Sequence, residues 1–244
     1  FEWIEIDVQI RNPDGSMADS LEGVKLPSGF SGVPGTVCAQ KYLRKAGVPK
    51  YLRTVPEDGV PIWLQRSEPD HERLQTVDAA ERMGGEIDGR QLFRRLAGTW
   101  TYWGWKYGYF ASEADARAYF DEMCYLIASQ RSAPNSPQWF NTGLHWAYGI
   151  EGPAQGHSYV DPDTGELGRS TNAYEHPQPH ACFIQSVSDS LVGGTDSIMG
   201  LWNREALLFK YGSGTGSNFS NIRGKGEPLS GGGTSSGLLS FLKI

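Results

Sequence analysis

Hydrophobic and polar positions alternate near the start of the chain. An isoleucine or valine stands at every second position from Ile4 to Ile10, with acidic or amide residues between them. A period of two residues predicts a half-buried β-strand. The following residues, 12–15, read Asn-Pro-Asp-Gly, which is typical of a turn that ends such a strand.

Helical spacing follows Ser112. Asp115 stands three residues after this serine, an arrangement that predicts a capped helix start. Apolar residues then recur at helical intervals, at Ala116, Tyr119, Phe120, Met123 and Ile127. The proline-containing segment 132–137 is expected to end the helix.

A second helix is predicted between two strands in the last quarter of the chain. Residues 182–187 and 217–222 have strand character, and Thr195 or Asp196 is expected to begin the intervening helix. Gly212 is a natural end for that helix. Its apolar positions are Ile198, Leu201, Trp202, Leu208 and Phe209. Strand, helix, strand and a further apolar run at 238–242 predict an α/β fold with parallel strands.

Three other segments have a distinct composition. Residues 27–75 are rich in proline and glycine and hold a short helical stretch from Cys38 to Ala46. Residues 99–110 are dense in aromatic side chains, which we expect in a core or an interface, because nearby acidic residues disfavour stacking on bases. Residues 150–178 are polar and turn-rich, which predicts an inserted loop or hairpin.

Charge and cysteine content narrow the classes of protein. The net charge of −6 over 244 residues argues against a nucleic-acid-binding surface, and no apolar run approaches the ~20 residues of a membrane span. Three cysteines are too few and too widely spaced for a disulfide scaffold, which favours a reducing cytoplasm. We expect Cys38 and Cys124 to be packing residues.

Metal and phosphate motifs do not account for the remaining polar residues. The spacings of the five histidines match no ligand pair, so no metal site is predicted; they are His71, His145, His157, His176 and His180. The glycines of 212–216 fit neither the dinucleotide-binding motif nor the P-loop. Glycine nevertheless lets backbone amides approach a ribose or a diphosphate closely.

Three segments carry a family resemblance. They are 133–141 (APNSPQWFN), 179–187 (PHACFIQSV) and 210–223 (KYGSGTGSNFSNIR). In this order they resemble the catalytic chain of ribonucleotide reductases, and the whole chain is most similar to the N-terminal part of the adenosylcobalamin-dependent class II enzymes. The resemblance implies a mainly helical or mixed region at 1–130. It also implies that 131–244 holds the opening strands of a ten-stranded α/β barrel, incomplete in this chain.

The resemblance implies thiyl-radical reduction of ribonucleotides to 2′-deoxyribonucleotides for DNA synthesis. Cys182 matches a reducing cysteine of the first barrel strand, whereas its partner cysteine and the radical cysteine belong to later sequence. Ser136 matches a residue that meets the substrate diphosphate. Ala181 and Cys182 match ribose contacts, and Gly214 matches a glycine that flanks the substrate.

The resemblance also implies an allosteric site for a deoxynucleoside triphosphate. Asp189 and Ser190 match the pair that holds the effector sugar, and Lys210 and Arg223 match cations on its phosphates. The implied cofactor is adenosylcobalamin, with contacts largely outside these residues. The implied partners are a ribonucleotide, a thioredoxin-like reductant and a second copy of the chain.

Two other hypotheses stay open at this point. A non-catalytic nucleotide-binding regulatory module would keep only the effector half, and a cysteine hydrolase would use Cys182 with His180, two residues before it. The chain stops directly after the apolar run 238–242, so we interpret it as a fragment and expect it to be inactive in isolation.

Overall fold

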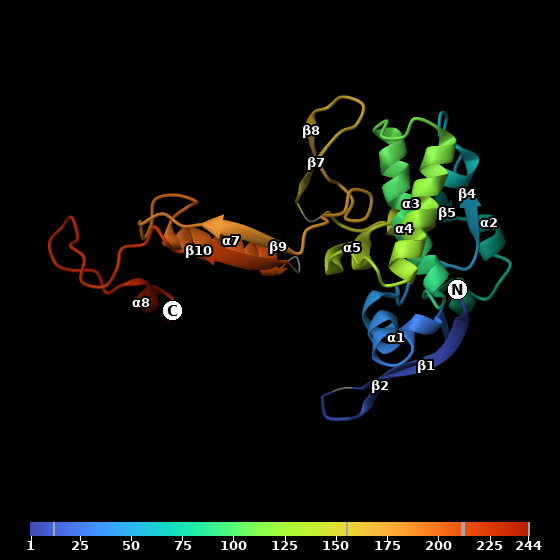
Figure 1. The fold of residues 1–244 in the computed structure, drawn as a ribbon, viewed down its shortest axis with the longest axis horizontal. Coiled ribbons are helices and arrows are strands. Elements are labelled where there is room, and N and C mark those ends of the chain that lie inside the picture. The colour runs from blue at the N-terminus through green and yellow to red at the C-terminus, as the bar shows by residue number, and fades with distance from the viewer. Residues whose placement is uncertain (12, 155, 211–212, 244) are drawn as a thin grey trace. The chain divides into compact units, whose positions relative to one another are not determined.

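The computed structural model describes residues 1–11, 13–154, 156–210 and 213–243 (Figure 1). Contacts divide the chain into two compact units, unit 1 (Phe1–Pro179) and unit 2 (His180–Ile244). The boundary that the sequence predicted between residues 130 and 131 falls inside unit 1 and stays a prediction about how the family is organised.

Unit 1 begins with a hairpin. β1 (Trp3–Arg11) pairs antiparallel with β2 (Met17–Pro27), which confirms the strand predicted from alternation. Val8 is buried, and Ile4 and Ile6 are half-buried, so the apolar side of β1 faces the core. Asn12, the first residue of the predicted turn, lies outside the described residues.

Two long helices form the body of unit 1. In α3 (Gly89–Lys106) the Asp88 side chain caps the start. In α4 (Glu113–Ala128) the Ser112 side chain accepts a hydrogen bond from the Asp115 N–H at 3.2 Å, as predicted. The helix ends at Ala128, with Ser129 as its C-cap, before the prolines that were expected to stop it.

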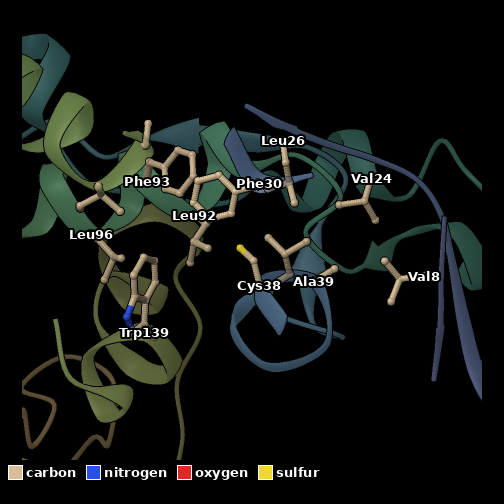
Figure 2. Packing of buried hydrophobic residues seen from close by; sticks show 13 residues of the cluster. Val8, Val24, Leu26, Phe30, Cys38, Ala39, Leu92, Phe93, Leu96 and Trp139 are labelled. Atoms are coloured by element: carbon tan, nitrogen blue, oxygen red, sulfur yellow. The ribbon is translucent and has the colours of Figure 1, made fainter. Parts of the chain in front are cut away.

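The main core lies between the hairpin, α3 and a short helical segment (Figure 2). That segment is α1 (Val33–Val37) continued by one turn of π-helix, η2 (Cys38–Tyr42). The helical stretch predicted up to Ala46 is therefore shorter and ends at Tyr42. The core side chains of Figure 2 are Val8, Val24, Leu26, Phe30, Cys38, Ala39, Leu92, Phe93, Leu96 and Trp139.

Shorter elements complete unit 1. The hairpin of β7 (Ser158–Val160) and β8 (Leu167–Arg169) confirms the hairpin expected within 150–178. Trp100, Tyr102 and Trp105 of the aromatic segment are half-buried, in line with packing. The other elements are η1 (Ser28–Phe30), β3 (Val48–Pro49), β4 (Leu52–Thr54), η3 (Ile62–Leu64), β5 (Ser67–Pro69), α2 (His71–Leu74), η4 (Ala79–Glu81), β6 (Met83–Gly84), α5 (Ser136–Asn141) and α6 (Leu144–Tyr148).

Unit 2 is a strand–helix–strand unit followed by one helical turn. β9 (Cys182–Ser186) and β10 (Gly214–Asn218) pair in parallel, and α7 (Ile198–Lys210) connects them. α8 (Leu238–Phe241) follows. The predicted order of elements and the parallel pairing are confirmed.

Two boundaries in unit 2 differ from the prediction. The second strand covers Gly214–Asn218 instead of 217–222, and a turn follows in which the Ile222 N–H donates to the Phe219 carbonyl at 3.0 Å. α7 begins at Ile198 instead of Thr195 or Asp196, because the Ser197 hydroxyl accepts from the Gly200 N–H at 3.1 Å and caps the helix. Gly212, its predicted end, lies outside the described residues.

Each sheet within the described residues has two strands. Helices and these small sheets together give the chain a mixed α/β character. The ten-stranded barrel stays a prediction. In the part of the chain that the structure describes, no helix has both the length and the apolar character needed to cross a membrane.

Candidate functional site

Cys182 and Gly214 open the two parallel strands of unit 2 and stand opposite each other in register. The Gly214 N–H donates to the Ala181 carbonyl at 2.6 Å. A Cβ on Gly214 would lie 3.1 Å from the Cys182 sulfur, which is tighter than most real contacts. A larger residue at position 214 would therefore require the thiol to shift. The structure thus brings together three of the predicted substrate-binding residues.

The two faces of this sheet have different neighbours. α7 contacts one face, where Arg204 Nε donates to Gln185 Oε1 at 2.7 Å. On the same face, Glu205 Oε1 accepts from the hydroxyls of Thr215 and Ser217, each at 2.9 Å. Side chains alternate along a strand, so Cys182 belongs to the opposite face, where Ile184 is 83% exposed.

The sequence patterns did not lead us to predict a role for Glu205, although its helical spacing indicated one. It stands four residues after the buried Leu201 and three before the half-buried Leu208, so helical spacing places it on the apolar side of α7. A carboxylate at such a position requires polar partners, and the hydroxyl-bearing strand Gly214–Asn218 provides two.

Asp189 and Arg223 form an ion pair. Arg223 Nε donates to Asp189 Oδ2 at 2.5 Å, and the Arg223 backbone N–H donates to Oδ1 at 3.2 Å. The guanidinium also donates to the Pro228 carbonyl at 3.1 Å. Hydrogen bonds from Arg223 hold the pKa of Asp189 below its usual range. The predicted sugar acceptor and one predicted phosphate cation are therefore in contact.

Ser190 and Lys210 lie between the two members of this pair in the sequence. The Ser190 N–H donates to the Ser188 carbonyl at 2.8 Å, and its hydroxyl donates to the Val192 carbonyl at 2.6 Å, so it shapes the turn before α7. Lys210 is the last residue of α7 and is exposed.

The candidate substrate residues Cys182 and Gly214 and the Asp189–Arg223 pair lie at opposite ends of the same two strands. The effector candidate Lys210 ends α7 just before β10 and so stands at the substrate end of the strands, away from the pair. Cys182 and Gly214 are the first residues of β9 and β10, whereas Asp189 and Arg223 follow the carboxyl ends. Four residue steps along a strand span about 13 Å.

Ser136 belongs to unit 1. It is the first residue of α5, with Pro137 after it, and it is exposed. The structure places Ser136 relative to the other residues of unit 1.

The other two cysteines pack in unit 1. Burial raises the pKa of Cys38 to about 12 and that of Cys124 to about 11. The Cys124 thiol lies 3.9 Å from the Phe93 carbonyl oxygen. Within the described residues, no group of three or more histidine, cysteine or acidic side chains is placed to hold a metal ion.

Two family models match the chain. The model described as class II vitamin B12-dependent ribonucleotide reductase matches residues 5–130, and the ribonucleotide reductase barrel domain matches residues 180–244. The second match coincides with unit 2, which contains Cys182 and the Asp189–Arg223 pair.

Curated relatives extend the similarity over nearly the whole chain. The vitamin B12-dependent ribonucleotide reductase of Agrobacterium fabrum is 64% identical over 97% of this chain, and that of Bradyrhizobium diazoefficiens is 62% identical over 97%. The Streptomyces avermitilis protein of the same name is 31% identical over 99% of the chain. The matched parts are 18%, 19% and 18% of these relatives, so the chain spans about a fifth of their length.

Proposed function

This chain belongs to the class II vitamin B12-dependent ribonucleotide reductase family, and we propose that it works as the opening part of a longer catalytic chain that reduces ribonucleotides to 2′-deoxyribonucleotides. The family matches the resemblance that the sequence motifs predicted. The proposal that the chain works within a longer one is supported by its coverage of about a fifth of its curated relatives.

The observation that carries the proposal is the position of Cys182. Its thiol is exposed, at the start of a parallel strand and on the face opposite α7. Replacing the 2′-hydroxyl by hydrogen consumes two electrons, which a pair of thiols supplies on becoming a disulfide. The ribonucleotide and the dithiol thereby give a deoxyribonucleotide, a disulfide and water. Cys182 provides one thiol, and the second comes from a later strand of the full-length chain.

The substrate is a ribonucleoside di- or triphosphate. Ser136 meets its diphosphate, and Ala181, Cys182 and Gly214 surround its ribose. The close contact between Gly214 and the Cys182 sulfur supports this assignment, because a larger residue would displace the thiol.

Asp189, Ser190 and Arg223 bind a deoxynucleoside triphosphate effector; Lys210 is assigned with them by the resemblance alone, because it stands at the other end of the strands. The Asp189–Arg223 ion pair supports this assignment, since it presets both groups at one end of the strands. A guanidinium has five donor N–H groups, so Arg223 can take an effector phosphate while Asp189 turns to the sugar hydroxyl. Charge-assisted bonds of this kind are the strong ones.

The proposed cofactor is adenosylcobalamin, which generates the radical when bound. The apolar cavity between α7 and α8, about 160 Å³ in volume, is too small for it, since even drug-sized ligands occupy roughly 300–1,000 Å³. We assign no cobalamin contact to the residues that line this cavity. A thioredoxin-like reductant regenerates the dithiol, a second copy pairs with the chain, and a reducing cytoplasm keeps Cys182 as a thiol.

The test uses the full-length enzyme with Cys182→Ser. We expect multiple-turnover reduction to be abolished and nucleotide binding to be nearly intact, because the substitution removes electrons and few contacts. Cys124→Ser is the matched control and should retain turnover. Sustained turnover of Cys182→Ser with a thiol reductant would reject the assignment and favour a regulatory nucleotide-binding module.

A further inference from the structure

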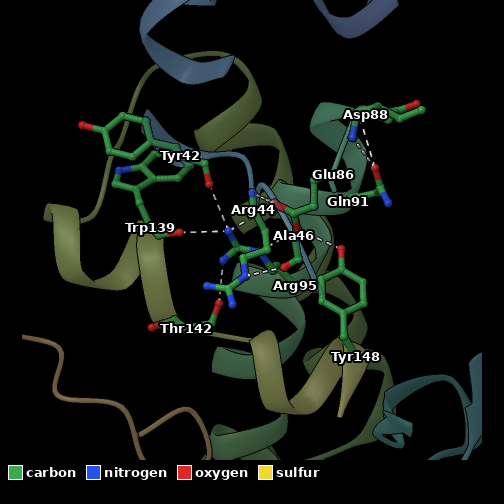
Figure 3. Close-up of polar contacts among 11 residues, drawn as sticks. Tyr42, Arg44, Ala46, Glu86, Asp88, Gln91, Arg95, Trp139, Thr142 and Tyr148 are labelled. Atoms are coloured by element: carbon green, nitrogen blue, oxygen red, sulfur yellow. Dashed lines mark hydrogen bonds and ion pairs between the residues drawn. The ribbon is translucent and has the colours of Figure 1, made fainter. Parts of the chain in front are cut away.

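An ion pair is completely buried in unit 1 (Figure 3). Arg95 Nε lies 2.7 Å from Glu86 Oε1, and the two side chains are 1% and 0% exposed. Arg95 stands on α3 between Leu92 and Leu96, on the face that packs into the core. A buried pair of charges adds little net stability compared with apolar residues of the same size. The role of this pair is therefore to fix the positions of the groups that it contacts.

Glu86 is saturated by three donors besides the Arg95 Nε. Its oxygens accept from the Arg44 backbone N–H at 2.8 Å, from the Tyr148 hydroxyl at 2.8 Å and from Arg95 Nη2 at 3.3 Å. Burial, reinforced by this carboxylate, raises the pKa of Tyr148 well above its usual range. Glu86 thus holds the guanidinium of Arg95 in one orientation.

The remaining donors of Arg95 reach the end of α5. Nη1 donates to the Thr142 carbonyl at 2.7 Å, and Nη2 donates to the Trp139 carbonyl at 2.9 Å (Figure 3). Nη2 also approaches the Tyr42 carbonyl at 3.2 Å. Carbonyls in the last turn of a helix have no partner within the helix. Arg95 supplies that partner and so ties α5 to α3.

α5 depends on such contacts for its position. It has six residues, too few to be stable as an isolated helix. Its other anchors are the bond from Trp100 Nε1 to Gln138 Oε1 at 2.9 Å and the stacking of Trp139 on Tyr42. Just after α5, a Cβ on Gly143 would lie 2.3 Å from the Arg95 carbonyl oxygen, so the chain meets α3 with no space to shift.

We propose that Arg95 is a positioning residue for the substrate: oriented by Glu86, it holds α5 so that Ser136 at the start of this helix stands in the correct place for the diphosphate. The inference rests on the proposed function, in which Ser136 meets the diphosphate. The fork of the guanidinium is essential, because three carbonyls and a carboxylate must be reached from one group. An ammonium group cannot reproduce that geometry.

The test compares Arg95→Lys with Ser136→Ala in the full-length enzyme. A second variant, Glu86→Gln combined with Arg95→Met, removes both charges together and leaves no unpaired buried charge. We expect KM and the calorimetric Kd for the ribonucleotide to rise about tenfold, or roughly 1.4 kcal/mol, in all three proteins. The value of kcat should be nearly unchanged, because lost ground-state binding raises KM alone.

Two controls separate this role from general damage. Arg53→Lys makes the same chemical change at the exposed pair with Glu68, and it should leave KM unaltered. A merely structural role of Arg95 would lower the active fraction, and thus the apparent kcat, at constant KM. That result in Arg95→Lys and the double variant, with KM raised in Ser136→Ala, would overturn the role of Arg95 and leave the proposed function standing. Unchanged substrate affinity in Ser136→Ala would instead reject the diphosphate assignment itself.

Discussion

The sulfur of Cys182 lies against Gly214. A Cβ added to that glycine would stand 3.1 Å from the sulfur. The two residues are partners in the parallel register of β9 and β10. Two positions later the same relationship recurs, since a Cβ on Gly216 would lie 3.0 Å from Ile184 Cδ1. The strand β10 therefore presents glycine opposite Cys182 and Ile184, the first two side chains that β9 directs onto the face away from α7.

This relationship predicts the effect of Gly214→Ala in the full-length enzyme. The added methyl group should displace the Cys182 thiol by a few tenths of an ångström and lower kcat several-fold, below the roughly hundredfold that a 1 Å displacement can cost. Gly216→Ala is the matched control, because the end of the Ile184 side chain can move aside. Steady-state kinetics measure both, and an equal loss in the two variants would contradict the argument.

The effector assignment predicts that Arg223→Ala weakens deoxynucleoside triphosphate binding by roughly 1.5–3 kcal/mol, the usual contribution of a hydrogen bond to a charged group. Basal activity should change less than the response to effector, because allosteric coupling is separate from the chemical step. Calorimetry measures the affinity. Arg53→Ala at the exposed Glu68 pair serves as the control, and an unaltered effector affinity in Arg223→Ala would reject the site.

The three cysteines should differ in reactivity at neutral pH. Burial raises the pKa of Cys38 to about 12 and that of Cys124 to about 11, so both remain protonated thiols, whereas the alkylating species is the thiolate. Cys182 is exposed. We expect iodoacetamide to modify Cys182 first in the native full-length enzyme, as measured by peptide mass spectrometry over time. Modification of Cys38 at the same rate would be inconsistent with this core.

Residues 1–244 expressed alone should bind hydrophobic dyes, aggregate and show no reductase activity with adenosylcobalamin. Parallel strands are normally buried on both faces, whereas Ile184 is 83% exposed and Phe209 on α7 is 59% exposed. Dye fluorescence, light scattering and thermal melting measure the outcome. A soluble monomer that melts cooperatively would favour the regulatory module instead.

Periodicity predicted the elements whose burial is one-sided. The strand from Ile4 to Ile10, the helix capped by Ser112 and the order β9–α7–β10 all follow from local pattern and capping. The start of β10 was placed three residues late, because glycine has a low strand propensity and the strand begins with Gly214, Thr215 and Gly216. Their reason for being in a strand is the neighbouring side chains of β9, which no local pattern contains.

The candidate site was predicted by motif resemblance and only partly by physical reasoning. The Asp189–Arg223 contact joins segments that follow different strands, so its geometry depends on the parallel pairing. Arg95 was missed, although its spacing from Leu92 and Leu96 placed a charge on the core side of α3. Its partners Glu86 and Thr142 come from separate segments, and only the folded chain brings them together.

The alternation along β9 limits how this region can change during evolution. Because successive side chains point to opposite faces, a single-residue insertion or deletion between Cys182 and Ser186 would exchange the two faces for every residue beyond it. The thiol could then keep its side only if Gln185 lost its contact with Arg204. The five residues of the strand must therefore vary by substitution alone.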